Sequence, residues 1–124
     1  MESWECIQKA IDWIEQHIGE KMEILQLSGD TCLSPFYFQR LFKRLTGRPV
    51  MEYIKLRRLA RAADELLRTG QKISDIALEM GYENHETFTR AFKEIYGATP
   101  TTFRKQKPPV TTLIQSLIIW SDAR

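Results

Sequence analysis

The same ten-residue pattern occurs twice in the chain, as FQRLFKRLTG at residues 38–47 and as FTRAFKEIYG at residues 88–97. In both copies two phenylalanines are four residues apart, so they share one face of an α-helix, and a glycine ends the pattern. A residue that can cap a helix precedes each copy, Ser34 before Pro35 in the first and Asn84 in the second. The pattern therefore predicts two similar short, amphipathic helices.

Each of these helices has an apolar face and a polar face. We expect the apolar residues to lie in the core, namely Phe38, Leu41, Phe42, Leu45, Phe88, Ala91, Phe92 and Ile95. The outward positions of the two copies are then Phe36, Gln39, Arg40 and Lys43, and Glu86, Thr89, Arg90 and Lys93. Such outward faces favour contact with a polyanion.

Apolar residues at spacings of three and four predict further helices around the two copies. We expect helices at residues 4–18, 23–31, 34–47, 50–68, 73–80, 84–97 and 99–105. The sequence thus predicts an all-α fold of seven helices, in which two helix-turn-helix subdomains are joined by a long linker helix. The expected boundaries are residues 1–48 for the first subdomain, 49–69 for the linker helix, 70–107 for the second subdomain and 108–124 for a tail.

The length of the linker helix suits a protein that contacts duplex DNA twice. A helix from Val50 to Arg68 is roughly 28 Å long at 1.5 Å per residue, whereas successive turns of a major groove are about 34 Å apart. We therefore expect the two repeated helices to enter adjacent major-groove segments of one double-stranded DNA.

Charge and cysteine content narrow the class of protein. Residues 1–39 carry two basic and seven acidic side chains, whereas residues 40–107 carry fifteen basic and eight acidic side chains, so positive charge gathers around the repeats.

Cys6 and Cys32 lack the spacing of a zinc site or a disulfide framework, and we expect no metal and no cofactor. The chain has no leader pattern, and its most apolar stretch, residues 113–120, is too short to span a bilayer. We expect a cytoplasmic protein that does not bind a membrane.

Several outward side chains carry the groups that read bases: arginine pairs with guanine, glutamine with adenine, and threonine contacts a thymine methyl. The expected base-reading residues are Phe36, Gln39, Arg40, His85, Glu86, Thr87 and Arg90, and the expected phosphate contacts are Ser34, Lys43, Thr89 and Lys93. Some alternatives stay open. Arg40 and Arg90 also suit a phosphate or solvent. Glu86 suits either cytosine or the helix N-terminus, and Phe36 either presses on a thymine or tucks against the turn.

Other functions fit the sequence less well. An enzyme needs a nucleophile beside a base, paired carboxylates or a metal cluster, and no such grouping occurs at meaningful spacing. The alternative to DNA binding is a helical protein–protein interaction module, in which Phe36 or Trp120 serves association. On the expected linker helix, Lys55, Arg57, Arg58 and Arg61 either face phosphates between the two grooves or form a solvated face.

The second half of the chain resembles a known family. Residues Ile73-x-x-Ile76-Ala77-x-x-x-Gly81-Tyr82, followed by Phe88-x-Arg90-x-Phe92-Lys93-x-x-x-Gly97-x-x-Pro100-x-x-Phe103-Arg104, resemble the AraC/XylS signature. Residues 5–106 resemble the two-subdomain DNA-binding unit of its MarA, SoxS and Rob branch. The resemblance implies a bacterial transcription regulator, usually an activator, that acts beside RNA polymerase. It also implies base-reading roles for the residues named above.

The chain departs from the family pattern at three positions: Cys32 replaces the usual glycine of the first turn, Gly29 interrupts the first bracing helix, and Glu86 replaces a residue that is more often neutral. We therefore expect a less rigid first unit. Residues 108–124 do not belong to the signature. By resemblance to Rob-like regulators they form a linker to a missing effector domain, which would bind a small molecule; otherwise they are the end of a short regulator.

Overall fold

The computed structural model describes residues 3–107, and this region forms seven α-helices and no β-strand. The helices are α1 (Ser3–Gln16), α2 (Ile24–Gly29), α3 (Pro35–Thr46), α4 (Val50–Arg68), α5 (Ile73–Glu79), α6 (His85–Tyr96) and α7 (Pro100–Gln106). The prediction of an all-α fold with seven helices is confirmed. What we expected of the tail lies outside the described residues.

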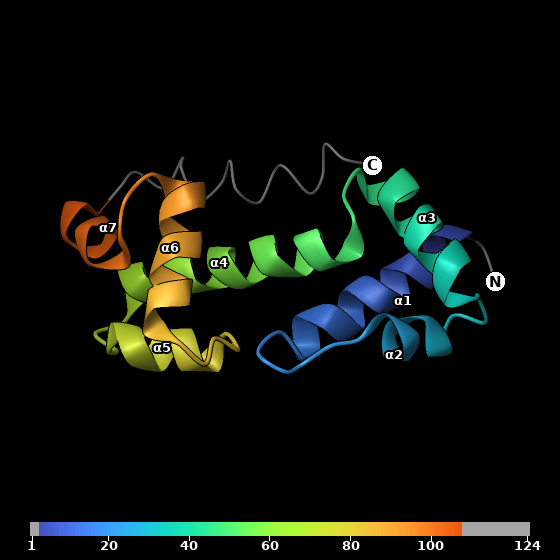
Figure 1. Ribbon diagram of the computed structural model, residues 1–124, viewed down its shortest axis with the longest axis horizontal. Coiled ribbons are helices and arrows are strands. Elements are labelled where there is room, and N and C mark those ends of the chain that lie inside the picture. The colour runs from blue at the N-terminus through green and yellow to red at the C-terminus, as the bar shows by residue number, and fades with distance from the viewer. Residues whose placement is uncertain (1–2, 108–124) are drawn as a thin grey trace.

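The helices gather at the two ends of α4, which is the longest of the seven. Helices α1, α2 and α3 pack on one another near the start of α4, whereas α5, α6 and α7 pack around its second half (Figure 1). In this view α3 and α6 both run from the lower part of the molecule to the upper part, one near each end of α4. The two repeated helices are therefore presented in the same sense.

Aromatic residues form the centre of each group of helices. Phe42 packs edge-on against Tyr53 of α4, with ring centroids 5.3 Å apart, and Phe92 packs against Phe103 of α7 at 5.1 Å. The predicted core positions on α3 and α6 are buried, except that Leu45 is half-buried and Ile95 is exposed.

The expectation for Ile95 was wrong because a neighbouring aromatic residue takes the inward place. Tyr96 stacks on Phe92, with centroids 4.7 Å apart, and also contacts Phe103 at 5.4 Å. Ile95 is left on the outer surface near the end of α6, where 44% of it is exposed.

The turns before α3 and α6 both contain a residue with a left-handed backbone conformation, but the residue differs. Gly81 has a φ of +88°, and Cys32, at the equivalent point of the first turn, has a φ of +62°. Left-handed backbone suits glycine and strains a residue with a Cβ. Cys32, which replaces the usual glycine of the family pattern, therefore has a backbone conformation that favours glycine. Gly29 does not interrupt α2, because it is the last residue of that helix.

Candidate nucleic-acid interface

Side-chain caps fix the starts of α3 and α6. The Ser34 hydroxyl accepts a hydrogen bond from the Tyr37 amide at 3.2 Å. The Asn84 side-chain oxygen accepts from the amides of Glu86 at 2.7 Å and Thr87 at 3.3 Å. These contacts satisfy amides that a helix start otherwise leaves unpaired. The cap of α6 is thus Asn84, and the Glu86 carboxylate stays exposed in the first turn.

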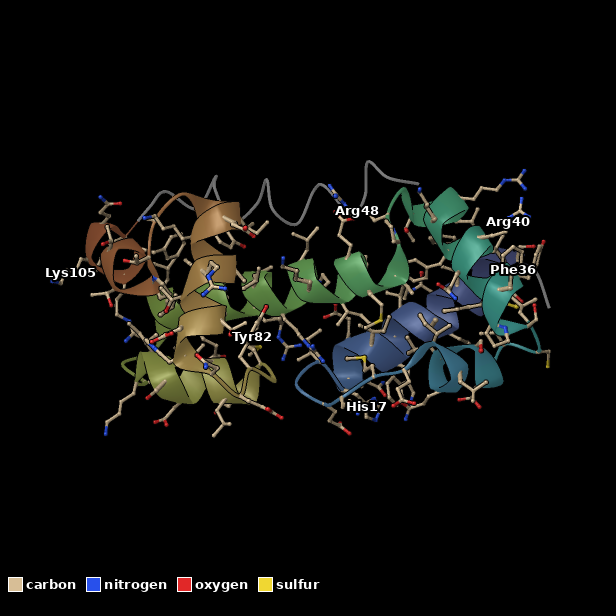
Figure 2. All side chains as sticks on the ribbon, viewed as in Figure 1. His17, Phe36, Arg40, Arg48, Tyr82 and Lys105 are labelled. Carbon is tan, nitrogen blue, oxygen red and sulfur yellow. The ribbon has the colours of Figure 1, made fainter. Side chains whose placement is uncertain are left out.

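The outward face of α3 carries the four side chains that the sequence predicted. Gln39, Arg40 and Lys43 are exposed, and Phe36 is 69% exposed, so it does not tuck against the turn. The Arg40 guanidinium lies 5.6 Å from the centre of the Phe36 ring, close enough for a cation–π contact, and both side chains lie at the outer edge of the molecule (Figure 2). Together with Pro49 and the start of α4, these residues line a shallow hollow of about 280 Å³.

The outward face of α6 repeats this arrangement with different chemistry. His85, Glu86, Thr87, Arg90 and Lys93 are exposed, and Thr89 is half-buried. Arg90 and Lys93 occupy the positions of Arg40 and Lys43, fifty residues further along the chain. The aromatic residue of α3, Phe36, has the carboxylate of Glu86 as its counterpart. The two faces therefore share their basic residues and differ in the residues near the helix start.

The basic side chains on these two faces are unpaired. Within residues 3–107, the side chains of Arg40, Lys43, Arg90 and Lys93 make no hydrogen bond and no ion pair with another residue of that region. Unpaired, solvated cations that share one face can exchange counterions for phosphates without first breaking a contact inside the protein.

The basic residues of α4 are instead engaged within the protein. Arg57 makes two hydrogen bonds to the Glu15 carboxylate, at 2.6 and 3.0 Å. Arg58 donates to the backbone oxygens of Ile18 at 2.7 Å and Glu20 at 2.6 Å. The suggestion that this run faces phosphates is thus wrong for Arg57 and Arg58, because their guanidinium groups hold α1 and its following loop against α4.

Arg61 and Lys55, the other basic residues of this part of α4, also contact groups within the protein. Arg61 donates to the Glu15 backbone oxygen at 3.3 Å, and Lys55 lies 3.8 Å from the Glu94 carboxylate of α6. Burial alone would lower the pKa of Arg57, but its hydrogen bonds and charge attraction to Glu15 raise it overall. Burial lowers the pKa of Arg58, partly offset by Tyr82. The spacing of these basic residues in the sequence did not predict their partners, which lie about forty residues away in the chain.

The described region carries neither a metal-binding cluster nor a membrane-spanning helix. Residues 3–107 contain no group of three or more histidine, cysteine or carboxylate side chains placed to hold a metal ion. None of the helices in that region combines the length and the apolar character that a membrane span requires.

Comparisons with known proteins agree with this architecture. A family of helix-turn-helix domains matches residues 27–106. Regulatory protein SoxS of Salmonella typhimurium is 38% identical over 104 residues, which cover 84% of this chain and 97% of SoxS. The HTH-type transcriptional regulator YbfP of Bacillus subtilis is 42% identical over 99 residues, 80% of this chain. A transcriptional regulator with an AraC-type DNA-binding domain from Chromobacterium violaceum superimposes with a TM-score of 0.78 at 26% identity, covering 84% of this chain and 93% of that one.

The fold, and the two helices whose outward faces carry unpaired basic side chains, define a DNA-binding transcription regulator of the helix-turn-helix class. Within that class, the chain belongs to the AraC/XylS family and resembles its SoxS-like members. It spans nearly the whole of SoxS but only 34% of the length of YbfP.

Proposed function

We propose that the chain activates transcription by placing α3 and α6 in two successive major-groove segments of one DNA duplex. In this proposal the base-reading side chains are Phe36, Gln39 and Arg40 on α3, and His85, Glu86, Thr87 and Arg90 on α6. Ser34, Lys43, Thr89 and Lys93 contact phosphates. Residues up to 48 and residues 70–107 act as two reading units, and α4 joins them.

The observation that carries this proposal is the contrast between paired and unpaired cations. The cations of α4 are bound to carboxylates or backbone oxygens, whereas those on the outward faces of α3 and α6 are unpaired among the described residues. Pairing within the protein lowers the gain from binding a phosphate, since the first contact must be given up. The unpaired cations on α3 and α6 can therefore meet phosphates without giving up a contact inside the protein.

The positions of these residues along each helix support distinct roles. Residues at the N-terminal end of a recognition helix reach base edges, and residues further along meet the backbone. The centre of the Phe36 ring lies 5.6 Å from the Arg40 guanidinium, and a guanidinium can pair in a planar, bidentate way with guanine O6 and N7. Lys43 and Lys93 lie one turn nearer the C-terminal end, where a flexible ammonium suits a phosphate.

The spacing of the two units also supports the proposal. Helix α4 has 19 residues, which corresponds to roughly 28 Å at 1.5 Å per residue. Helices α3 and α6 lie near its opposite ends and run in the same sense (Figure 1). One duplex face presents its major groove again after about 34 Å, so a modest bend of the DNA would bring both segments within reach.

The family relation carries the remaining parts of the proposal. An activator of this kind works beside RNA polymerase, so we propose RNA polymerase as a second partner. Regulation by a small molecule is proposed only for a longer protein in which an effector domain accompanies this chain.

A promoter fused to a reporter tests the activator role. Expression should rise when the chain is supplied and its operator lies upstream, and repression at every operator position would contradict that role.

Salt titration of DNA binding tests the interface itself. Neutralised phosphates release counterions, so the logarithm of the binding constant should fall linearly with the logarithm of salt concentration. Lys43→Gln and Lys93→Gln should each reduce that slope by about one. Arg68→Gln is the matched control, because Arg68 is paired with Asp64 on the same helix at 2.7 Å and its loss should leave the slope unchanged. Binding that does not depend on salt would refute the proposed interface.

A further inference from the structure

We propose that the loop between α1 and α2 acts as a second connection between the two units, and that this connection sets the half-site spacing that the protein accepts. This inference rests on the proposed function, in which α3 and α6 bind one duplex together. The contacts that support it lie inside the protein, and neither recognition helix makes them.

The centre of this connection is a contact between two backbones. Gly19, in the loop after α1, lies so close to the carbonyl of Glu79 at the end of α5 that a Cβ at position 19 would overlap its oxygen. A Cβ on Gly81 would lie 2.9 Å from the Gly19 oxygen. In Figure 1 this loop lies beside the turn that joins α5 to α6. The first unit therefore touches the turn that positions the second recognition helix.

Glycine is present at position 19 because of space rather than backbone conformation. Gly81 has a φ of +88°, which itself favours glycine, whereas Gly19 has no positive φ. The expected first helix, at residues 4–18, ends directly before Gly19. The structure ends α1 at Gln16 and uses Gly19 for the close approach of the two units.

The Arg58 side chain of α4 holds the loop in this place. Arg58 donates to the backbone oxygens of Ile18 and Glu20, the two neighbours of Gly19, at 2.7 and 2.6 Å. The Arg58 guanidinium carbon would lie only 3.6 Å from a Cβ at Gly81. A single side chain of α4 thus contacts the loop of the first unit and lies against the turn of the second.

The first unit also meets α4 at two other places. Phe42 packs on Tyr53 near the start of α4. Arg57 and Arg61, at the middle of α4, bind Glu15 of α1. All of these contacts join the first unit to α4 rather than to the second unit. The loop contact lies at the far end of α1, whose 14 residues extend about 21 Å. The loop contact joins the first unit directly to the turn before α6, and in this inference that direct contact fixes the orientation of α3 relative to α6.

The spacing preference of the protein tests this inference. The operator is first selected from random duplexes with the wild-type chain, and binding is then measured on duplexes in which base pairs are inserted or removed between the two half-motifs. Wild type should lose roughly a hundredfold in affinity when the spacing changes by one or two base pairs, because linked readers lose their joint binding when the geometry forbids it. Arg58→Gln and Gly19→Ala should reduce that ratio to about tenfold or less.

Matched controls separate a change of spacing from a change of stability. Arg68→Gln removes another arginine of α4 that bridges nothing between the units, and Gly70→Ala adds a Cβ where no atom lies within 4 Å. Both controls should keep the wild-type ratio. Thermal unfolding of every variant shows that it is folded. An unchanged ratio in folded Arg58→Gln and Gly19→Ala would overturn the inference, whereas a wild type that selects a single short motif would instead refute the proposed function.

A distance measurement without DNA tests the same inference independently. Spin labels at Arg44→Cys and Glu94→Cys, two exposed and equivalent positions on α3 and α6, report the separation of the helices in a Cys32→Ser background. The distance distribution should be narrow in the otherwise unchanged chain and clearly broader after Arg58→Gln. Equal widths in the two proteins would overturn the inference even if DNA binding were lost.

Discussion

Replacing Cys32 by glycine is expected to stabilise the protein. Cys32 has a φ of +62° in the turn before α3, at the position where the turn before α6 has Gly81. Left-handed backbone costs a residue with a Cβ about 1–2 kcal/mol. Glycine avoids that cost but loses roughly 0.5–1 kcal/mol through the greater freedom of the unfolded chain. The net gain should therefore be roughly 0–1.5 kcal/mol.

Urea unfolding followed by far-ultraviolet circular dichroism, with a reducing agent present, measures this gain. If thermal unfolding is used instead of urea, a change of about 1 kcal/mol in stability shifts Tm by roughly 4–8 °C for a small domain. Cys32→Ser is the matched control, because serine removes the thiol and keeps the Cβ, so its free energy of unfolding should stay near that of wild type. The reverse change, Gly81→Ala, should destabilise by more than 1 kcal/mol because its Cβ would also press on the Gly19 oxygen.

The outcome that refutes this reasoning is a loss of stability in Cys32→Gly. Equal stabilisation by Cys32→Ser would also contradict it, since the gain would then come from removing the thiol. Cys32 is exposed, so neither change leaves a cavity in the core.

Three other substitutions have expected outcomes. Asn84→Ala removes the cap of α6 and should cost about 1 kcal/mol in thermal unfolding. Glu15→Gln weakens the two hydrogen bonds from Arg57 and should lower the free energy of unfolding by roughly 1–3 kcal/mol in urea, with no loss being the contrary result. Phe36→Ala removes an exposed ring beside Arg40, so DNA affinity should fall roughly two- to fivefold while Tm stays unchanged; a fall in Tm would mean that Phe36 is structural.

Local patterns predicted the helices because each helix carries its own signals. Ser34 and Asn84 both act as the predicted caps, and the paired phenylalanines are buried as their spacing indicates. The predicted span of α4, Val50 to Arg68, matches the structure. Periodicity and capping are properties of neighbouring residues, so a single sequence is enough to find them.

Contacts between distant segments were not predictable in the same way. The spacing of Arg57 and Arg58 is equally compatible with phosphate contact, solvent and an internal ion pair, and nothing near them in the chain identifies Glu15 or the Ile18 oxygen as their partners. Gly19 carries no sign that another backbone approaches it. Ile95 matched the apolar pattern, but tertiary packing gave the inward place to Tyr96.

The most direct test of two-segment reading is selection from random DNA duplexes with wild type, Arg40→Ala and Arg90→Ala in parallel. Wild type should select two half-motifs about one helical turn apart. Each variant should lose roughly 1–3 kcal/mol on that site and relax the base preference in one half only, a different half for each. A single short motif for wild type, or equal losses of both variants on selected and random DNA, would contradict the account.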